Sequence, residues 1–328
     1  MTMSVTSANL QGQSGVDHFL PKELGKPEFN AATEPELTVR PGTGETIGFE
    51  TDDEMYVQLH ERGSLEKVTA AINAITGPVY VEGAEPGDAL KVTIHDIVLK
   101  EHGWSAAVPG MGALDDRMGG GTFSRKIPIE DGQVQLTESV ATPVLPMIGC
   151  IGTAPAEGTG STLMPSFDSG GNMDLTGAAP GSSVYLPVRV PGALLSIGDL
   201  HAVMARGESS FVAIEAAGVA VVSVDLVKGM TPRAPRVGSC FIGIGNPVQE
   251  SIRRGYEDAF DFLVDDHGWS KEDAYVVMSA VAHSELGGPT GSEAPDPLHP
   301  FRPVGAVTVH RLPKRVLGEE AARADGRL

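Results

Sequence analysis

The residues best suited to chemistry follow an apolar stretch in the middle of the chain. After this stretch ends at Gly198, Asp199 and His201 follow with one residue between them, and Glu208 comes after a glycine-containing turn. In an extended chain this spacing places the side chains of Asp199 and His201 on the same face. Carboxylates and an imidazole that converge at the end of a strand are ligands for a divalent cation. The pattern predicts a metal site that activates water, with a nearby carboxylate as general base. The same residues also fit a structural interpretation, because an Asp-x-His pair in a loop often only hydrogen-bonds to backbone.

Two further groups of polar residues are candidates for the same site. Asn172 and Asp174 follow two glycines, which let the backbone approach a ligand closely, and their side chains point to one side. Asp53 lies in the acidic segment 51–54, five residues before Gln58. Taken alone, the first group is typical of a turn and the second of a solvated surface.

Several familiar catalytic motifs are absent from the sequence. The chain has no P-loop, no dinucleotide-binding glycine fingerprint and no zinc-binding His-Glu-x-x-His pattern. The segment 207–210 is not a nucleophile elbow, because it lacks the second glycine of Gly-x-Ser-x-Gly. These absences leave the carboxylate and imidazole residues as the main candidates.

The elements that must position these residues are mostly short strands. Alternating apolar residues over 36–40, 45–50, 77–82 and 89–100 predict strands, with glycine and proline turns between them. The segments 183–190, 193–197 and 212–226 have the same character. We therefore expect a mainly β fold, either a sandwich or a distorted barrel of short strands, with a C-terminal α/β portion.

Two helices are expected in that C-terminal portion. The first follows Asn246 and Pro247, with an apolar stripe at Ile252, Tyr256, Phe260 and Leu263. The second starts at a capping pair, Ser270 and Asp273. We expect a flexible N-terminal segment at residues 1–35, a catalytic body at 36–230, and the C-terminal portion with a polar tail at 231–328.

Composition excludes several classes of partner. The formal net charge is −19, which disfavours nucleic acid and anionic membrane surfaces. No apolar run approaches the roughly 20 residues that span a bilayer, and the N-terminus has no apolar export signal. Cys150 and Cys240 fit reduced thiols, so we expect a cytoplasmic protein. Edge-type strands and apolar loops suit a homo-oligomer.

Five ordered blocks of sequence resemble the acetamidase/formamidase family. Its Thr-Gly-Pro…Ala-Glu-Pro-Gly-Asp signature is similar to residues 76–88, and its Ile-Gly-x-Ile-Gly-x-Ala-Pro motif to residues 148–155. The Gly-Gly-Asn-x-Asp loop matches residues 170–174, and the family's longest block resembles residues 185–202. The early Asp and Gln of the family correspond to Asp53 and Gln58. Together the blocks span residues 36–280, most of the chain.

The resemblance implies a divalent metal and the hydrolysis of short amides to carboxylate and ammonia. We assign Asp53, Asp199 and His201 to the metal, Glu208 to proton transfer, and Asn172 and Asp174 to the catalytic site, where Asn172 orients the substrate amide. Zinc is the expected ion, and manganese, iron(II) or calcium are alternatives.

Three departures from the family pattern lie near these motifs. Ser169 stands where the family usually has His, and Arg206 stands where it has Asp. Residues 283–297 replace the family's usual segment. One hypothesis is that these changes adapt the pocket to a larger or differently charged amide. An inactive scaffold that binds a metabolite and a metal-dependent hydrolase or lyase acting on another bond are the alternatives.

Overall fold

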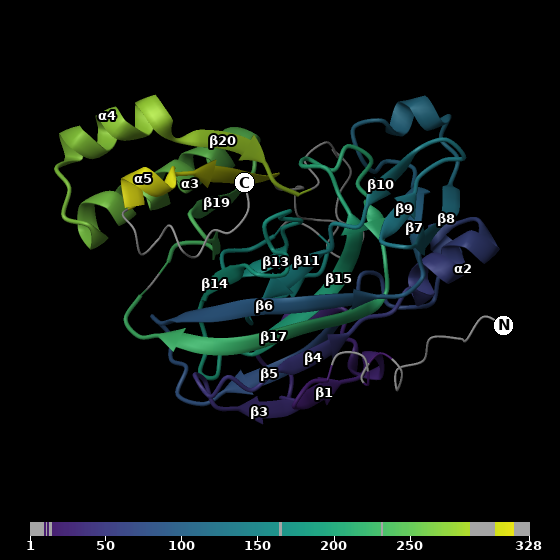
Figure 1. Ribbon diagram of the computed structural model, residues 1–328, viewed down its shortest axis with the longest axis horizontal. Helices are drawn as coiled ribbons and strands as arrows, with labels where there is room; N and C mark the ends of the chain where they lie inside the picture. Colours follow the sequence, from purple (N-terminus) through teal and green to yellow (C-terminus); the bar gives the residue numbers. More distant parts are fainter. Residues whose placement is uncertain are drawn as a thin grey trace.

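The computed structural model describes residues 10, 12, 15–163, 166–230, 232–288 and 306–317. Strands dominate, and most of them form two large open sheets (Figure 1). Residues 289–297 of the segment that departs from the family lie outside the described residues.

The first sheet runs from the N-terminus to the C-terminal portion. Within the described residues it contains nine strands, in the order β1 (His18–Leu20), β4 (Ile47–Glu50), β17 (Gly218–Val227), β6 (Ala89–Leu99), β14 (Ser183–Pro187), β18 (Arg236–Val237), β19 (Cys240–Gly245), β21 (Ala306–Arg311) and β20 (His283–Leu286). The C-terminal strands therefore continue the sheet of the body. A boundary at residue 230 falls between β17 and β18, in a connection between strands of one sheet.

The second sheet carries the candidate site. In the described part of the chain it contains ten strands, eight of them in the order β10 (Ala141–Pro143), β9 (Gln133–Gln135), β8 (Phe123–Glu130), β7 (His102–Ala107), β16 (Ile214–Glu215), β15 (Leu195–Val203), β11 (Met147–Gly152) and β13 (Gly170–Asn172). β5 (Ile75–Val81) pairs with β15, and β3 (Leu37–Val39) pairs with β5. β2 (Glu28–Asn30) and β12 (Thr159–Ser161) form a separate pair. Thus β1 and β2 lie inside the N-terminal segment that we expected to be flexible.

The two sheets share one hydrophobic core. Leu90, Val92 and Ile94 of β6 are fully buried and pack in the same cluster as Ile148 of β11 and Ile197 of β15. The alternation in residues 89–100 thus identifies the core face of β6 correctly. The mainly β prediction is confirmed in its sandwich form, because neither sheet closes into a barrel.

Both expected C-terminal helices are present, at slightly different positions. They are α3 (Val248–Asp261), extended by the π-helical turn η4 (Phe262–Asp266), and α4 (Lys271–Val281). The Ser270 side chain accepts a hydrogen bond from the Asp273 N–H, which confirms the capping pair of α4. Pro247, not Asn246, occupies the cap of α3, and it makes no side-chain capping bond.

The face of α3 that is buried differs in part from the apolar stripe that the sequence predicts. Ile252 is 36% exposed, whereas Ser251, Gly255 and Ala259 are buried. A Cβ at Gly255 would lie 2.1 Å from the ring of His310. Small residues therefore form this face because α3 packs closely against β19 and β21.

The remaining helical segments are short. They are α2 (Glu54–Arg62), α5 (Lys314–Leu317) and the 3₁₀ turns η1 (Lys22–Leu24), η2 (Leu65–Lys67) and η3 (Asp115–Met118). Among the described helices, none has the length and apolar character needed to cross a bilayer.

Candidate metal centre

β15 brings Asp199 and His201 into the middle of the second sheet. The strand continues to Val203, past Gly198 where we expected it to end. Its neighbours explain this extension, because His201 pairs with Met147 of β11 on one side and with Glu215 of β16 on the other. The Asp-x-His motif is therefore part of a paired strand and not of a loop.

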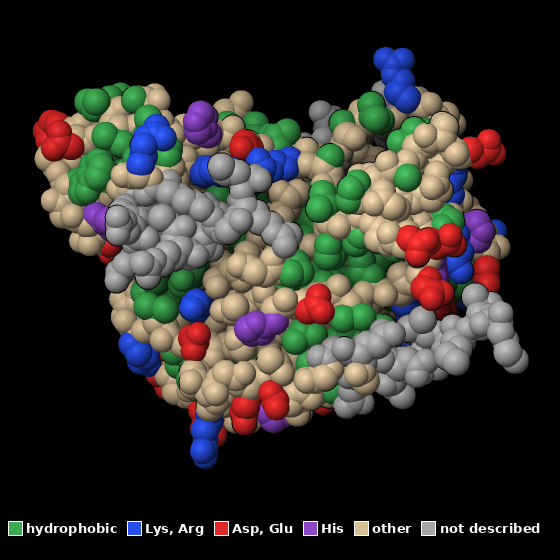
Figure 2. All heavy atoms as spheres, in the orientation of Figure 1, with side chains coloured by type: hydrophobic (Ala, Val, Ile, Leu, Met, Phe, Trp, Pro, Cys, Tyr) green, Lys and Arg blue, Asp and Glu red, His purple; other side chains and the backbone are tan. Residues whose placement is uncertain are grey.

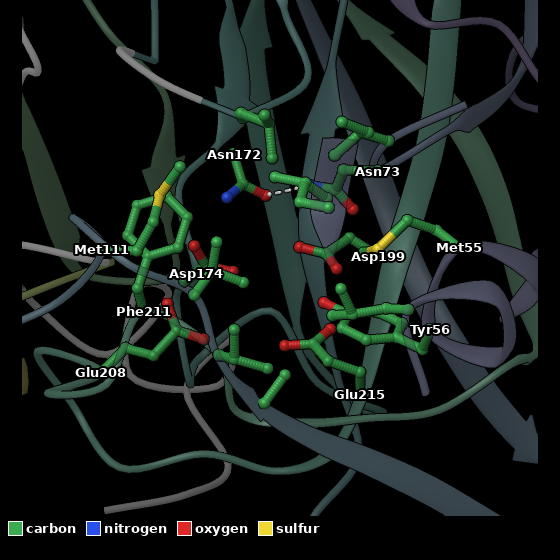
Figure 3. Close-up of a pocket in the computed structure, with 17 residues that line it drawn as sticks. Met55, Tyr56, Asn73, Met111, Asn172, Asp174, Asp199, Glu208, Phe211 and Glu215 are labelled. Atoms are coloured by element: carbon green, nitrogen blue, oxygen red, sulfur yellow. Dashed lines mark hydrogen bonds between the residues drawn. The ribbon is translucent and has the colours of Figure 1, made fainter. Parts of the chain in front are cut away.

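Four acidic side chains and one imidazole converge at this point. The His201 Nε2 lies 3.5 Å from Asp174 Oδ1, 3.3 Å from Asp199 Oδ2 and 3.2 Å from Glu215 Oε2. Asp174, Asp199 and His201 form one group able to hold a metal ion, and His201, Glu208 and Glu215 form a second. We call these five residues the acid cluster, and Figure 3 shows its carboxylates directed into one pocket.

Three residues of the acid cluster have unusual backbone conformations. The φ angles are 46° at Asp174, 57° at Asp199 and 35° at Glu208, all in the left-handed region. Residues other than glycine adopt this region rarely, and the cost is on the order of 1–3 kcal/mol each. Strain of this kind concentrates at functional sites, which supports a role for these three residues together.

Gly149 of β11 leaves a space at the centre of the cluster. A Cβ at this position would lie 2.5 Å from Asp174 Oδ1, 2.5 Å from Asp199 Oδ2 and 2.8 Å from His201 Nε2. These separations are too short for a methyl group, so only glycine at this position lets the three atoms gather against β11. The Asp174 and Asp199 oxygens and the His201 nitrogen are therefore close enough together to hold one ion.

Hydrogen bonding supports the same interpretation. Among the described residues, both carboxylate oxygens of Asp174 and both ring nitrogens of His201 are buried without a hydrogen-bond partner. Buried polar groups without partners are costly and rare in folded proteins. A divalent cation would give these oxygen and nitrogen atoms the partner that they lack, so the residues present fit a metal ion.

The electrostatics of the cluster reflect crowded negative charge. Burial raises the pKa of Glu215 to about 7, with His201 opposing and Asp199 reinforcing the rise. Burial and the Asp174 charge raise the pKa of Glu208 well above its usual value. Burial disfavours the charged form of His201, but Glu215 and Asp199 overcome it and raise the pKa of this imidazole. The protein without a cation therefore holds protons at this site.

Asp53 lies outside both metal-binding groups. Its carboxylate accepts hydrogen bonds from Lys100 Nζ at 2.9 Å, Trp104 Nε1 at 2.9 Å and His102 Nε2 at 3.0 Å. Asp174 instead occupies the place beside Asp199 and His201 that we expected for Asp53. The physical reason is that three donors, on β7 and on the connection that precedes it, already satisfy the Asp53 carboxylate.

The pocket above the cluster is small. Its cavity volume is about 50 Å³. Since roughly 10–15 Å³ is needed for one water, it holds a few waters or one very small molecule. Asn73 Nδ2 donates to Asn172 Oδ1 at 3.1 Å across the pocket, as Figure 3 shows. Met111 and Phe211 line the apolar side of the pocket.

Sequence reasoning missed three residues of this pocket. Glu215 lies in the segment 212–226, where a single carboxylate among the otherwise apolar residues 212–222 was the available signal. Tyr56 lies beside Glu215 on the pocket wall, and Asn73 has a left-handed φ of 52°. Neither Tyr56 nor Asn73 belongs to a local pattern that indicates a site.

Ser169 and Arg206, two of the departures from the family pattern, do not line this pocket. Ser169 is fully buried, and its hydroxyl donates to the Thr153 carbonyl oxygen at 3.1 Å. Arg206 forms an ion pair with Glu285 of β20 and donates from Nε to Thr176 Oγ1 at 3.1 Å. Arg206 and Glu285 both depart from the family pattern, and they contact each other.

The fold and the site define a class: β-sandwich proteins with a buried carboxylate–imidazole centre of the kind that holds a divalent cation. A family model described as the Acetamidase/Formamidase family matches residues 29–162 and 157–247. The chain therefore belongs to the acetamidase/formamidase family, as its sequence motifs predicted.

Named relatives agree with this assignment. The chain is 29% identical over 232 residues to a formamidase of Methylophilus methylotrophus, covering 54% of this chain and 55% of the relative. It is 30% identical over 222 residues to an acetamidase of Mycolicibacterium smegmatis, covering 49% of this chain and 55% of the relative. The matched region thus spans a little over half the length of these curated relatives.

A solved structure extends the similarity to nearly the whole chain. The crystal structure of a predicted acetamidase/formamidase from Thermoanaerobacter tengcongensis superposes with a TM-score of 0.80 at 31% sequence identity. The match covers 92% of this chain and 96% of that protein. The fold described above, including its C-terminal portion, is therefore that of the family.

Proposed function

We propose that this protein is a metal-dependent hydrolase that converts short carboxamides, such as formamide and acetamide, to a carboxylate and ammonia. One observation carries the proposal. Asp174, Asp199 and His201 bring their ligand atoms close together beside Gly149, and several of these atoms have no hydrogen-bond partner among the described residues. The formamidase and acetamidase relatives supply the class of substrate.

The same three residues are the proposed metal ligands. Their mixed oxygen and nitrogen donors suit zinc, and manganese or calcium are alternatives because carboxylates dominate the cluster. When bound, such a cation would polarise the amide carbonyl and activate a water molecule. The roles of Glu208 and Asn172 then follow from their positions around the pocket.

Glu208 is the proposed proton carrier. Its carboxyl is 6% exposed, and burial among other acids raises its pKa well above the usual value. A raised pKa suits a group that takes a proton from water and returns it to the leaving ammonia near neutral pH. Glu215 borders the same pocket and is the candidate to share this proton.

Asn172 is the proposed group that orients the amide. Its Oδ1 accepts a hydrogen bond from Asn73, so its Nδ2 is the atom that presents a donor to the pocket. A donor at this position suits the carbonyl oxygen of a carboxamide. The small cavity favours formamide and acetamide over larger amides, which would collide with Met111 and Phe211.

The test is ammonia release by the purified protein from formamide, acetamide and longer amides, before and after chelation. The variants Asp199→Ala and His201→Ala remove two proposed ligands. His95→Ala is a matched control, because His95 is exposed, hydrogen-bonds to Ser223 on the first sheet and does not line the small pocket. Metal content is measured on the same samples.

We expect release that disappears on chelation and in both ligand variants, but persists in the control. A preference for longer amides would contradict the size argument. Failure to release ammonia from any amide, together with the absence of bound metal, would instead favour a non-catalytic scaffold that binds a metabolite.

We also propose a cytoplasmic location, because Cys150 is a fully buried thiol that suits a reducing compartment. Protein fractionation from the source cells, with a compartment marker, tests this proposal.

A homo-oligomer is the proposed assembly. Tyr275 is 71% exposed and Val276 is 65% exposed, side by side on α4. Exposed apolar residues that are adjacent often mark an interface. Light scattering on the purified protein gives its mass directly, and a monomer at all concentrations would refute this proposal.

A further inference from the structure

A second and much larger cavity also borders Asp174, beside the small pocket above the acid cluster. Its volume is about 400 Å³, within the range of roughly 300–1,000 Å³ that is typical of ligand sites. It lies between the body and the C-terminal strands β19, β20 and β21. We call it the interlobe cavity. Figure 2 shows a notch between the C-terminal lobe and the part of the body that carries β8, β9 and β10, with basic side chains on the C-terminal side of this notch.

The lining of the interlobe cavity is mostly apolar and includes two arginine side chains. Met147, Met204, Leu286 and Val309 contribute apolar surface. The charged side chains of the lining are those of Arg206, Arg311 and Asp174. The lining thus holds two cations and one carboxylate, in a chain whose formal net charge is −19.

The two arginines are incompletely compensated. Arg206 has a carboxylate partner, Glu285, but the Arg311 Nε is buried and has no hydrogen-bond partner among the described residues. Burial lowers the pKa of Arg206, and the positive charge of Arg311 lowers it further. Two guanidinium groups that repel each other beside one carboxylate have room for a second anion.

We propose that the interlobe cavity binds a small organic carboxylate with an apolar body. The carboxylate pairs with Arg311 and Arg206, and the body packs against the methionine and leucine side chains. Guanidinium groups match carboxylates with two parallel hydrogen bonds, which accounts for arginine at both positions. The proposal does not depend on amide hydrolysis, because it concerns a separate cavity and a direct binding measurement.

The position of the cavity places its occupant next to the acid cluster. Asp174 forms part of both linings. Arg206 and Glu208 lie on one turn, which is joined to the C-terminal portion by a hydrogen bond from Gly207 N to Gly287 O at 2.8 Å. The bound carboxylate therefore contacts the turn that carries the proposed proton carrier.

Isothermal titration calorimetry with hexanoate on the full chain tests the proposal, with acetate and hexan-1-ol as comparison probes. Hexan-1-ol keeps the apolar body but lacks the charge, whereas acetate keeps the charge but lacks most of the body. Arg311→Gln removes the buried guanidinium. Ala179→Phe fills the cavity from a surface turn without altering either arginine. Arg40→Gln is the matched control, because Arg40 forms an exposed ion pair with Glu82 and lines neither cavity.

We expect hexanoate to bind at least about tenfold more tightly than hexan-1-ol or acetate, because both its charge and its body are recognised. Arg311→Gln and Ala179→Phe are each expected to weaken hexanoate binding by about tenfold or more, while Arg40→Gln leaves it unchanged.

Four results would overturn the proposal. The first is the absence of hexanoate binding to the unaltered protein. The second is equal binding by the protein and its Arg311→Gln and Ala179→Phe variants. The third is binding that is lost in Asp199→Ala but kept in Arg311→Gln, which would place the carboxylate at the acid cluster. If acetate binds as tightly as hexanoate through Arg311, the apolar body has no role and the stated ligand class is wrong.

Discussion

The protein buries carboxylates in two neighbouring places that differ in what surrounds them. At Asp53, three donors from Lys100, His102 and Trp104 contact one carboxylate. In the acid cluster, four carboxylates share the single imidazole of His201. The Asp53 carboxylate therefore has all its hydrogen-bond partners within the protein. The acid cluster has more hydrogen-bond acceptors than donors.

This difference explains how two buried acids of similar sequence character can have different roles. A buried carboxylate with three donors stabilises the fold and has little reason to bind an ion. Buried carboxylates without enough donors are destabilising until a cation or protons arrive. The donor count around each acid, rather than its burial, therefore separates the structural centre from the proposed metal centre.

The strongest test of the comparison is Gly149→Ala. The added methyl would lie within 2.8 Å of one atom each of Asp174, Asp199 and His201, so it would push these proposed ligands out of place. We expect loss of bound metal and a fall in amide hydrolysis on the order of 10³-fold, because the centre supplies the nucleophile. Metal analysis and ammonia release measure the two effects.

Gly121→Ala is the matched control for this variant. A Cβ at Gly121 meets no atom within 4 Å, so this change alters a glycine without filling a site. If Gly149→Ala retained stoichiometric metal and normal turnover, the atoms gathered beside Gly149 would not be the ligands of the cation.

A second test removes one charge from each centre while keeping its shape. Asp53→Asn leaves Lys100 and its neighbours without an anionic partner, so we expect the free energy of unfolding to fall by about 3 kcal/mol. Asp174→Asn relieves repulsion in the chelated protein, so we expect little change or a small gain in stability there. Its cation affinity should fall by about 100-fold. Urea unfolding with chelator and metal titration measure the two quantities.

The opposite pattern would reverse the assignment of the two centres. If Asp53→Asn weakened cation binding and left stability unchanged, Asp53 would be a ligand, as its place in the family pattern implies.

The third test uses the opposite pH dependence of the two centres. Burial raises the pKa of Glu215 to about 7 in the folded protein, above the unfolded value of about 4.3. Its contribution is therefore fully present at low pH and is lost as the pH rises. At Asp53, burial favours the neutral form, but hydrogen bonds from His102, Trp104 and Lys100 prevail and lower the pKa. That contribution is present above pH ~3.9 and is lost as the pH falls further.

For the chelated protein we expect the free energy of unfolding to decline by roughly 2 kcal/mol between about pH 5 and about pH 7. Glu215→Gln should flatten this decline, and Asp53→Asn should leave it intact while flattening the loss below about pH 4. Urea unfolding across this pH series provides the measurement. A decline of equal size in Glu215→Gln would show that Glu215 is not its source.

The features that could be predicted from the sequence alone are the local ones. Strand alternation identified β6 and its buried face, and the capping pair of Ser270 and Asp273 located the start of α4. The one-residue spacing of Asp199 and His201 correctly placed both in one cluster. These features depend on neighbours in the chain, whose geometry the backbone periodicity fixes.

Which residues from distant parts of the chain share the site depends on how the strands pair in the folded protein. Glu215 faces His201 because β16 pairs with β15 in that register, and Gly149 leaves its space because β11 pairs on the other side. The same applies to Asp53, whose donors come from strands that follow it by about fifty residues. Such contacts depend on strand order and register across the sheet, which residue spacing within one strand does not specify.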